Sequence, residues 1–138
     1  RESWESCCFG GFLFAKEVIK SFLSQKIAGT IIFTGASASL RGKSNFGAFN
    51  SAKGALRNFA QALAKEYAEN SIHVSHVIVD GGLAGERIKQ RLSDFDQRVK
   101  EGKLINIENV TDAYMFLYNQ SKDAWTFELD LRTSQENW

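Results

Sequence analysis

Three short segments of the chain carry the apolar, β-branched pattern of strands inside a sheet. The first covers residues 30–34, between two glycines. The second covers residues 71–80, where polar and apolar residues alternate early and apolar residues dominate later, as in a strand of a sheet covered on both faces. The third, residues 124–131, alternates with period two and is typical of an edge strand. These patterns predict strands near residues 29–34, 72–80 and 125–131.

Helical periodicity fills the segments around the predicted strands. Apolar residues recur every three or four positions over residues 9–23 and 107–118, which predicts two amphipathic helices. Gly10 and Gly11 either weaken the start of the first helix or allow close packing against a neighbour. The longest predicted helix covers residues 46–69 and carries alanine on more than one face. Residues 86–103 are polar, with apolar residues at helical steps and a charged face that we interpret as solvated.

Strands that alternate with amphipathic helices predict an α/β fold in which helices cover both faces of a parallel sheet. His73 and His76 lie three residues apart on one predicted strand, so their side chains face opposite sides of the sheet. We therefore interpret each histidine as structural or surface-exposed rather than as part of a catalytic pair. Glu128 and Asp130 share one face of the edge strand, and we expect a solvated face there instead of an acid–base pair.

Composition and charge exclude several classes of function. The net charge of +1 argues against a nucleic-acid partner or an anionic membrane surface. No apolar run approaches the roughly 20 residues needed to span a bilayer. The two cysteines, Cys7 and Cys8, are adjacent and have no metal-ligand spacing to the histidines. We therefore expect reduced thiols, no metal site and a cytoplasmic location.

The first predicted strand, the polar loop of residues 36–45 and the long helix together resemble the catalytic segment of the short-chain dehydrogenase/reductase family. In that family the helix begins with Tyr-x-x-x-Lys, and a serine stands thirteen residues before the tyrosine. Lys53 matches the lysine, whereas Phe49 occupies the tyrosine position and Ala36 the serine position. The preceding helix resembles the family helix that supplies an asparagine, and Cys8 occupies the position of that asparagine.

This resemblance implies a nicotinamide cofactor, NAD or NADP, and a small carbonyl or alcohol substrate. The second strand resembles the family strand that ends beside the nicotinamide, so the implied cofactor-binding residues are Lys53, Asp80, Gly81 and Gly82. Read as a phosphate-binding loop, the same glycines fit neither common fingerprint. The polar residues 86–103 correspond to the substrate-binding flap of the family.

The resemblance covers nearly the whole chain but only the second half of the family fold. The family's pyrophosphate-binding turn, Thr-Gly-x-x-x-Gly-x-Gly, is not matched after Thr34 and Gly35, because Ser39 and Arg41 occupy the later glycine positions. We therefore expect residues 1–138 to form a single partial Rossmann-like domain. It would be part of a three-layer α/β/α sandwich that lacks the N-terminal half, and it would not bind a nicotinamide cofactor tightly by itself.

Two functions remain open from the sequence. By resemblance the chain is an NAD(P)-dependent oxidoreductase with weak or no activity, because neither phenylalanine nor alanine carries a hydroxyl for proton transfer. Alternatively it is a non-catalytic dehydrogenase-like protein that associates with itself or with a partner. The helices near residues 11–24 and 47–68 are the expected interface, since the resemblance implies a dimer formed through them.

Overall fold

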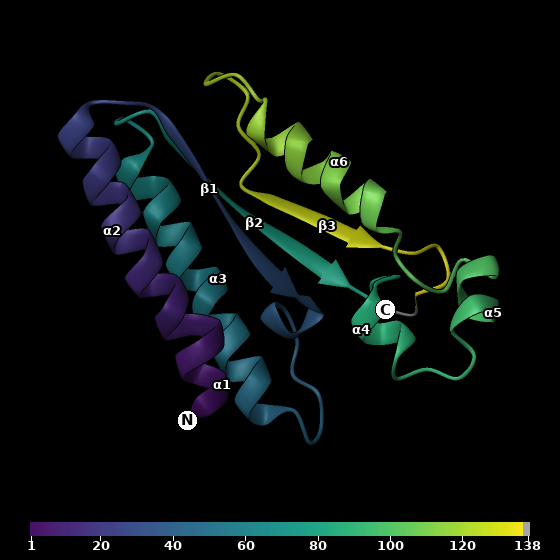
Figure 1. The fold of residues 1–138 in the computed structure, drawn as a ribbon. Helices are drawn as coiled ribbons and strands as arrows, with labels where there is room; N and C mark the ends of the chain where they lie inside the picture. Colours follow the sequence, from purple (N-terminus) through teal and green to yellow (C-terminus); the bar gives the residue numbers. More distant parts are fainter. Residues whose placement is uncertain (137–138) are drawn as a thin grey trace.

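The computed structural model describes residues 1–136, which form a parallel sheet between two layers of helices (Figure 1). The strands are β1 (Gly29–Ala36), β2 (Ile72–Asp80) and β3 (Glu128–Arg132), and they lie in the order β1-β2-β3. Both pairings are parallel, with Gly29 opposite Ile72 and His76 opposite Glu128. The carboxyl ends of all three strands therefore meet at one edge of the sheet, and the predicted α/β fold with a parallel sheet is confirmed.

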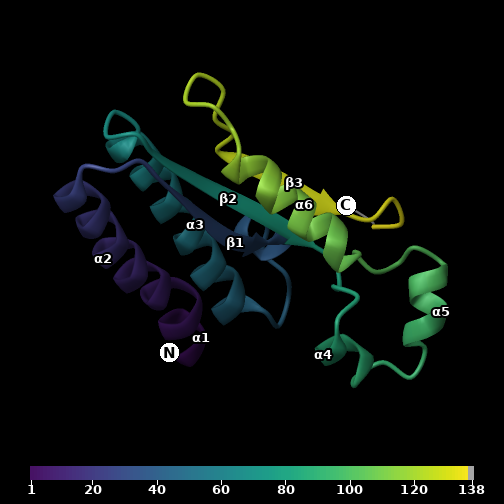
Figure 2. The same cartoon turned by 45° about the horizontal axis from the view of Figure 1, so that its top comes forward.

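Two long helices cover one face of the sheet and a third helix covers the other (Figures 1 and 2). The first helical segment comprises α1 (Glu2–Trp4), a π-helical turn η1 (Glu5–Phe9) and α2 (Gly10–Gln25). It lies beside α3 (Gly47–Tyr67), whereas α6 (Ile107–Tyr118) lies on the opposite face. The short helices α4 (Glu86–Lys89) and α5 (Phe95–Lys100) extend beyond the carboxyl edge of the sheet.

The main core lies between the sheet and the pair α2 and α3. Its buried side chains come from β1, β2, α2 and α3. They are Ala15, Ile19, Ile31, Phe33, Leu56, Ala60, Leu63, Ile72 and Val74. A Cβ atom at Gly11 would lie 2.9 Å from the Leu56 side chain. Gly11 therefore allows α2 to approach α3 closely, which decides between the two roles that the sequence left open for this glycine.

The third strand is shorter than predicted, because the first part of its alternating segment makes other contacts. The N–H of Thr126 donates to Gln120 Oε1 at 2.8 Å, and Gln120 Nε2 donates to Thr126 Oγ1 at 2.8 Å. The Trp125 ring stacks on the His73 ring, with centroids 4.9 Å apart. These contacts hold residues 124–127 as a loop over the amino end of β2, and strand pairing with β2 begins only at Glu128.

The expectation that Glu128 and Asp130 form a solvated face is wrong for Glu128. Its carboxylate accepts two hydrogen bonds from the Arg57 guanidinium, at 2.6 and 2.9 Å, and a third from His76 Nδ1 at 3.0 Å. Asp130 pairs with Arg132. Glu128 faces α3, which carries Arg57, and so lies under a helix although its strand is at the sheet edge.

Candidate functional site

Two of the predicted catalytic residues, Phe49 and Lys53, contact each other where β1 ends and α3 begins. Lys53 lies in the second turn of α3, and its Nζ donates a hydrogen bond to the carbonyl oxygen of Thr34 at 2.8 Å. Phe49 lies one turn earlier, and the Lys53 ammonium is 5.9 Å from the centre of its ring. Residues four apart share one helix face, so the spacing of the sequence motif produces this contact.

Ala36, which the sequence resemblance aligned with the family serine, ends β1 and has a methyl side chain. Its backbone N–H donates to Ser39 Oγ at 3.2 Å across the 3₁₀ turn η2 (Ser37–Ser39). Ser39 is buried, and its hydroxyl oxygen is the acceptor of this hydrogen bond. The arrangement of Phe49, Ala36 and Lys53 therefore provides a positive charge but no aromatic hydroxyl beside it.

Cys8 lies in the π-helical turn η1, which contacts α3. Burial, and secondarily the neighbouring Cys7, raises the pKa of the Cys8 thiol, which favours the uncharged form. A π-helical turn is a rare local structure that is frequent at functional sites. Apart from the two glycines that follow it, nothing in the sequence indicates this turn.

The residues predicted to lie beside the nicotinamide form a tight turn after β2. Asp80 is almost fully buried, and its carboxylate pairs with Arg41 Nη2 and Arg132 Nη1, each at 3.0 Å. Gly81 has φ +148°, a conformation that favours glycine, and a Cβ at Gly82 would lie 2.9 Å from Leu104. Both glycines thus have a backbone role, while the Asp80 carboxylate is already engaged by two guanidinium groups.

A pocket of ≈ 390 Å³ opens at this carboxyl edge of the sheet. Phe49 forms part of its wall together with residues of the β1–α3 loop, the end of β2 and the C-terminal segment. The complete lining is Ser37, Ala38, Arg41, Lys43, Phe46, Phe49, Asn50, Asp80 and Glu136. The pocket therefore adjoins the predicted catalytic position at residue 49.

An ion-pair network that the sequence patterns did not predict joins α3, β2 and β3. Arg57 pairs with Glu128, and the Glu128 carboxylate also accepts a hydrogen bond from Nδ1 of the fully buried His76. Burial lowers the pKa of His76 despite the Glu128 carboxylate, so the imidazole is neutral. The Arg57 guanidinium in turn lowers the pKa of Glu128. Only tertiary structure brings these three residues together, since their positions are far apart in the chain.

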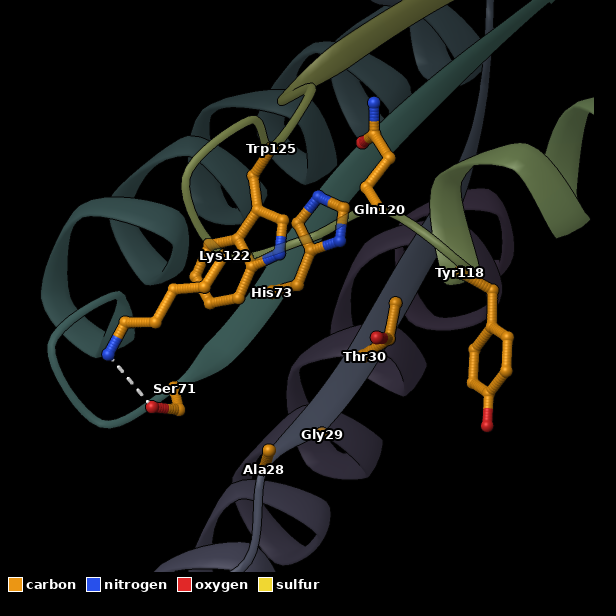
Figure 3. Close-up of a pocket in the computed structure, with 9 residues that line it drawn as sticks. All are labelled: Ala28, Gly29, Thr30, Ser71, His73, Tyr118, Gln120, Lys122 and Trp125. Atoms are coloured by element: carbon orange, nitrogen blue, oxygen red, sulfur yellow. Dashed lines mark hydrogen bonds between the residues drawn. The ribbon is translucent and has the colours of Figure 1, made fainter.

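A second pocket, of ≈ 470 Å³, lies at the opposite edge, where the strands begin (Figure 3). His73 and Trp125 lie stacked at this pocket, and Lys122 Nζ donates to Ser71 Oγ at 2.9 Å. His73 Nε2 is 3.0 Å from the Thr126 carbonyl oxygen and 2.8 Å from Ser75 Oγ. Lys53 and Phe49 lie at the other end of the sheet, so this pocket is separate from the candidate site. The two histidines face opposite sides of the sheet, as predicted.

The described residues 1–136 offer no cluster of three or more histidine, cysteine or acidic side chains suited to a metal ion. Over the same residues, no helix combines the length and the apolar character that a bilayer crossing requires.

The fold and the Lys53 site define the class of protein. The sequence model of the short chain dehydrogenase family matches residues 2–91, and the chain belongs to this family. It is similar to L-xylulose reductase of Bos taurus, with 26% identity over 114 residues that make up 79% of this chain and 47% of the relative. The family and this relative are oxidoreductases, in agreement with the class that the sequence motif predicted.

Solved structures show the same fold. A short-chain dehydrogenase from Rhodopseudomonas palustris superposes with a TM-score of 0.72 and 38% identity, covering 96% of this chain and 50% of its own. An NADP-bound structure described as a candidate 2-deoxy-D-gluconate 3-dehydrogenase, from Agrobacterium tumefaciens, has a TM-score of 0.73 at 17% identity, covering 88% of this chain and 52% of its own. The chain thus spans about half the length of the relatives that it matches, and nicotinamide cofactors occur within the family.

Proposed function

We propose that this chain supplies the lysine end of a nicotinamide site in a short-chain dehydrogenase-type oxidoreductase, and that its carbonyl reduction is weak or absent. The observation that supports this proposal is the contact between Lys53 and Phe49. The ammonium lies 5.9 Å from the ring centre, and the ring offers no hydroxyl. The charge that would favour an ionised tyrosine is retained, while the group that would transfer the proton is replaced.

The side chains present fit the ribose end of the cofactor in part. An ammonium group has three donors, and Lys53 uses one of them on the Thr34 carbonyl. The remaining two donors are suited to the ribose hydroxyls of NAD or NADP. Asp80 is less suited to a ligand, because Arg41 and Arg132 already bind its carboxylate. A bound reduced nicotinamide cofactor would supply the hydride. The proton for the substrate oxygen would have to come from water or from the substrate itself.

The experiment is a restoration of the two replaced groups. Residues 1–138 would be joined to a pyrophosphate-binding half, and the variant carrying Phe49→Tyr and Ala36→Ser would be compared with the unchanged protein. We expect steady-state reduction of a panel of ketones to rise by about 10²–10⁴-fold, the usual contribution of a positioned proton donor. The rate of ketone reduction should fall as the pH rises through the pKa of the new tyrosine, because only its protonated form can donate the proton and the Lys53 charge lowers that pKa.

Phe116→Tyr is the matched control, since Phe116 is exposed on α6 and does not line the pocket. Its hydroxyl should leave the rate unchanged. If the unchanged protein is already as fast as the restored one, residue 49 is not the catalytic position and the proposal is wrong.

Association is a second candidate function, supported by the apolar surface of the helical layer. Trp4, Phe9, Phe12 and Phe59 form a continuous series of ring contacts across α1, η1, α2 and α3. A groove of ≈ 410 Å³ lies between α2 and α3, lined by Phe12, Lys16, Ile19, Lys20, Leu23, Phe59, Leu63, Glu66 and Tyr67. Exposed apolar surface of this kind favours contact with a second copy of the chain.

A further inference from the structure

The loop that forms one wall of the pocket beside Phe49 is held by the residue that follows Phe49. Asn50 Nδ2 donates to the carbonyl oxygen of Arg41 at 2.7 Å, and Asn50 Oδ1 accepts from the N–H of Lys43 at 3.2 Å. A single side chain at the start of α3 thus binds the loop backbone on both sides of residue 42. The charged side chains of the loop are therefore carried on a well-defined backbone.

The buried end of the pocket contributes little net negative charge. The Asp80 side chain is 4% exposed, and its carboxylate lies 3.0 Å from a guanidinium nitrogen of Arg41 and 3.0 Å from one of Arg132. Arg132 also pairs with Asp130. The Asp80 charge is thus compensated by residues of the protein, and a ligand would meet the paired group rather than a lone carboxylate.

Two other charged side chains line the pocket, and neither has an ion-pair partner in the part of the chain that the structure describes. Within residues 1–136 no carboxylate pairs with the Lys43 ammonium, which lies 5.3 Å from the centre of the Phe46 ring. Within the same residues no cationic group pairs with the Glu136 carboxylate, which lies beside Gly81 at the end of β2. The pocket therefore presents one uncompensated positive charge and one uncompensated negative charge, together with the apolar rings of Phe46 and Phe49.

We propose that this pocket binds zwitterionic substrates, namely small alcohols or ketones that carry both a carboxylate and an ammonium group. The carboxylate would pair with Lys43 and the ammonium with Glu136, while the carbon skeleton contacts Phe46 and Phe49. An α-amino acid with a hydroxyl or keto group in its side chain has this chemistry. The inference rests on the proposed function, because it takes the pocket beside Phe49 as the substrate pocket.

Four compounds that share the threonine skeleton and differ in their charges test the proposal by binding alone. They are L-threonine, which carries both charges, N-acetyl-L-threonine, L-threoninamide and the neutral N-acetyl-L-threoninamide. Each would be titrated into the 15N-labelled 138-residue chain while the amide resonances of residues 36–50 are followed by NMR. We expect L-threonine to bind about tenfold more tightly than either singly charged compound, since each charge-assisted contact contributes roughly that factor.

Two variants assign the charges to the two side chains. Lys43→Met should make L-threonine and L-threoninamide bind equally, because the carboxylate has lost its partner. Glu136→Gln should make L-threonine and N-acetyl-L-threonine bind equally, because the ammonium has lost its partner. Lys100→Met, an exposed substitution in α5, is the matched control and should leave all four affinities unchanged.

Any of three results would overturn the proposal. These are equal affinity for the four compounds, tighter binding of the neutral compound, and no saturable shift of the amide resonances with any of them. These outcomes are distinguishable from failure of the proposed function, because binding requires neither cofactor nor proton transfer. Selective binding of L-threonine together with an unaltered rate in the Phe49→Tyr, Ala36→Ser variant would refute the catalytic proposal and leave the substrate class standing.

Discussion

Lys53 holds its ammonium group between the ring of Phe49, at 5.9 Å from the centroid, and the carbonyl oxygen of Thr34, at 2.8 Å. A cation above an aromatic face is attracted by the negative charge on that face. The residue one turn before Lys53 thus interacts with the ammonium group only as an aromatic ring and offers it no hydroxyl. Under the proposed function, Lys53 would position the cofactor while residue 49 could not transfer a proton.

The 138-residue chain alone should bind nicotinamide cofactors weakly. Lys53 is the proposed contact for the ribose end, but among the described residues no turn matches the glycine pattern that binds the pyrophosphate, which carries most of the cofactor's charge. We expect dissociation constants for NADH and NADPH weaker than about 100 μM by calorimetry. A low-micromolar constant for either cofactor would contradict this prediction.

The chain should self-associate through the layer formed by α2 and α3. Phe12 is 42% exposed on α2 and contacts Phe59 of α3, so Phe12→Glu would place a charge in the proposed interface. Sedimentation velocity should show a dimer for the unchanged chain and a monomer for this variant. Met115→Glu is the control, because Met115 is similarly exposed, at 47%, but lies on α6 at the opposite face. A strict monomer at high micromolar concentration would refute the interface.

Gly35→Ala should destabilise the chain, although the change adds only a methyl group. A Cβ at this position would lie 2.2 Å from His76 Nε2 and 2.9 Å from Ser39 Oγ. Because His76 is buried and held by Glu128, we expect a loss of about 1–3 kcal/mol in the free energy of unfolding. Urea denaturation would measure this loss.

Gly54→Ala provides the matched control for that substitution. Gly54 lies within α3, and a Cβ there would meet no atom of the described residues within 4 Å beyond the backbone of its own helix. Alanine there should stabilise the chain by about 0.5–1 kcal/mol, because it favours the helix without a clash. Equal effects of the two substitutions would show that His76 does not restrict the space at Gly35.

The stability of the fold should fall as the pH drops below about 6.5, the ordinary pKa of histidine. Burial lowers the pKa of His76 in the folded chain, so between the two pKa values the unfolded chain binds more protons and acid favours unfolding. The lowered pKa of Glu128 adds a further loss below its ordinary value of 4.5. Lys53 and Arg57 also face His76 and oppose its protonation.

Thermal denaturation of the unchanged chain and of His76→Gln, measured from pH 7.5 to pH 5, tests this dependence. Glutamine does not titrate, so the variant should lose the decline between pH 6.5 and 5 whatever its overall stability. The same decline in both proteins would place its origin at another group.

The order of secondary structure and the location of the candidate site could be predicted from local patterns. Period-two and period-3.6 hydrophobicity placed the strands and the long helices, because side-chain burial follows the geometry of the backbone. The spacing from Ala36 to Phe49 and Lys53 placed three residues where β1 meets α3, since a strand, a short loop and a helix leave few alternatives.

Contacts between distant segments were decided only by the tertiary structure. Glu128 follows the pattern of an exposed edge strand, yet Arg57 and His76 bind it because α3 crosses that face of the sheet. Trp125 continues the alternating pattern of the third strand, but its stacking on His73 keeps it in a loop. Local periodicity reports which face of an element is apolar; it contains no information on which charged group from another element will approach that face.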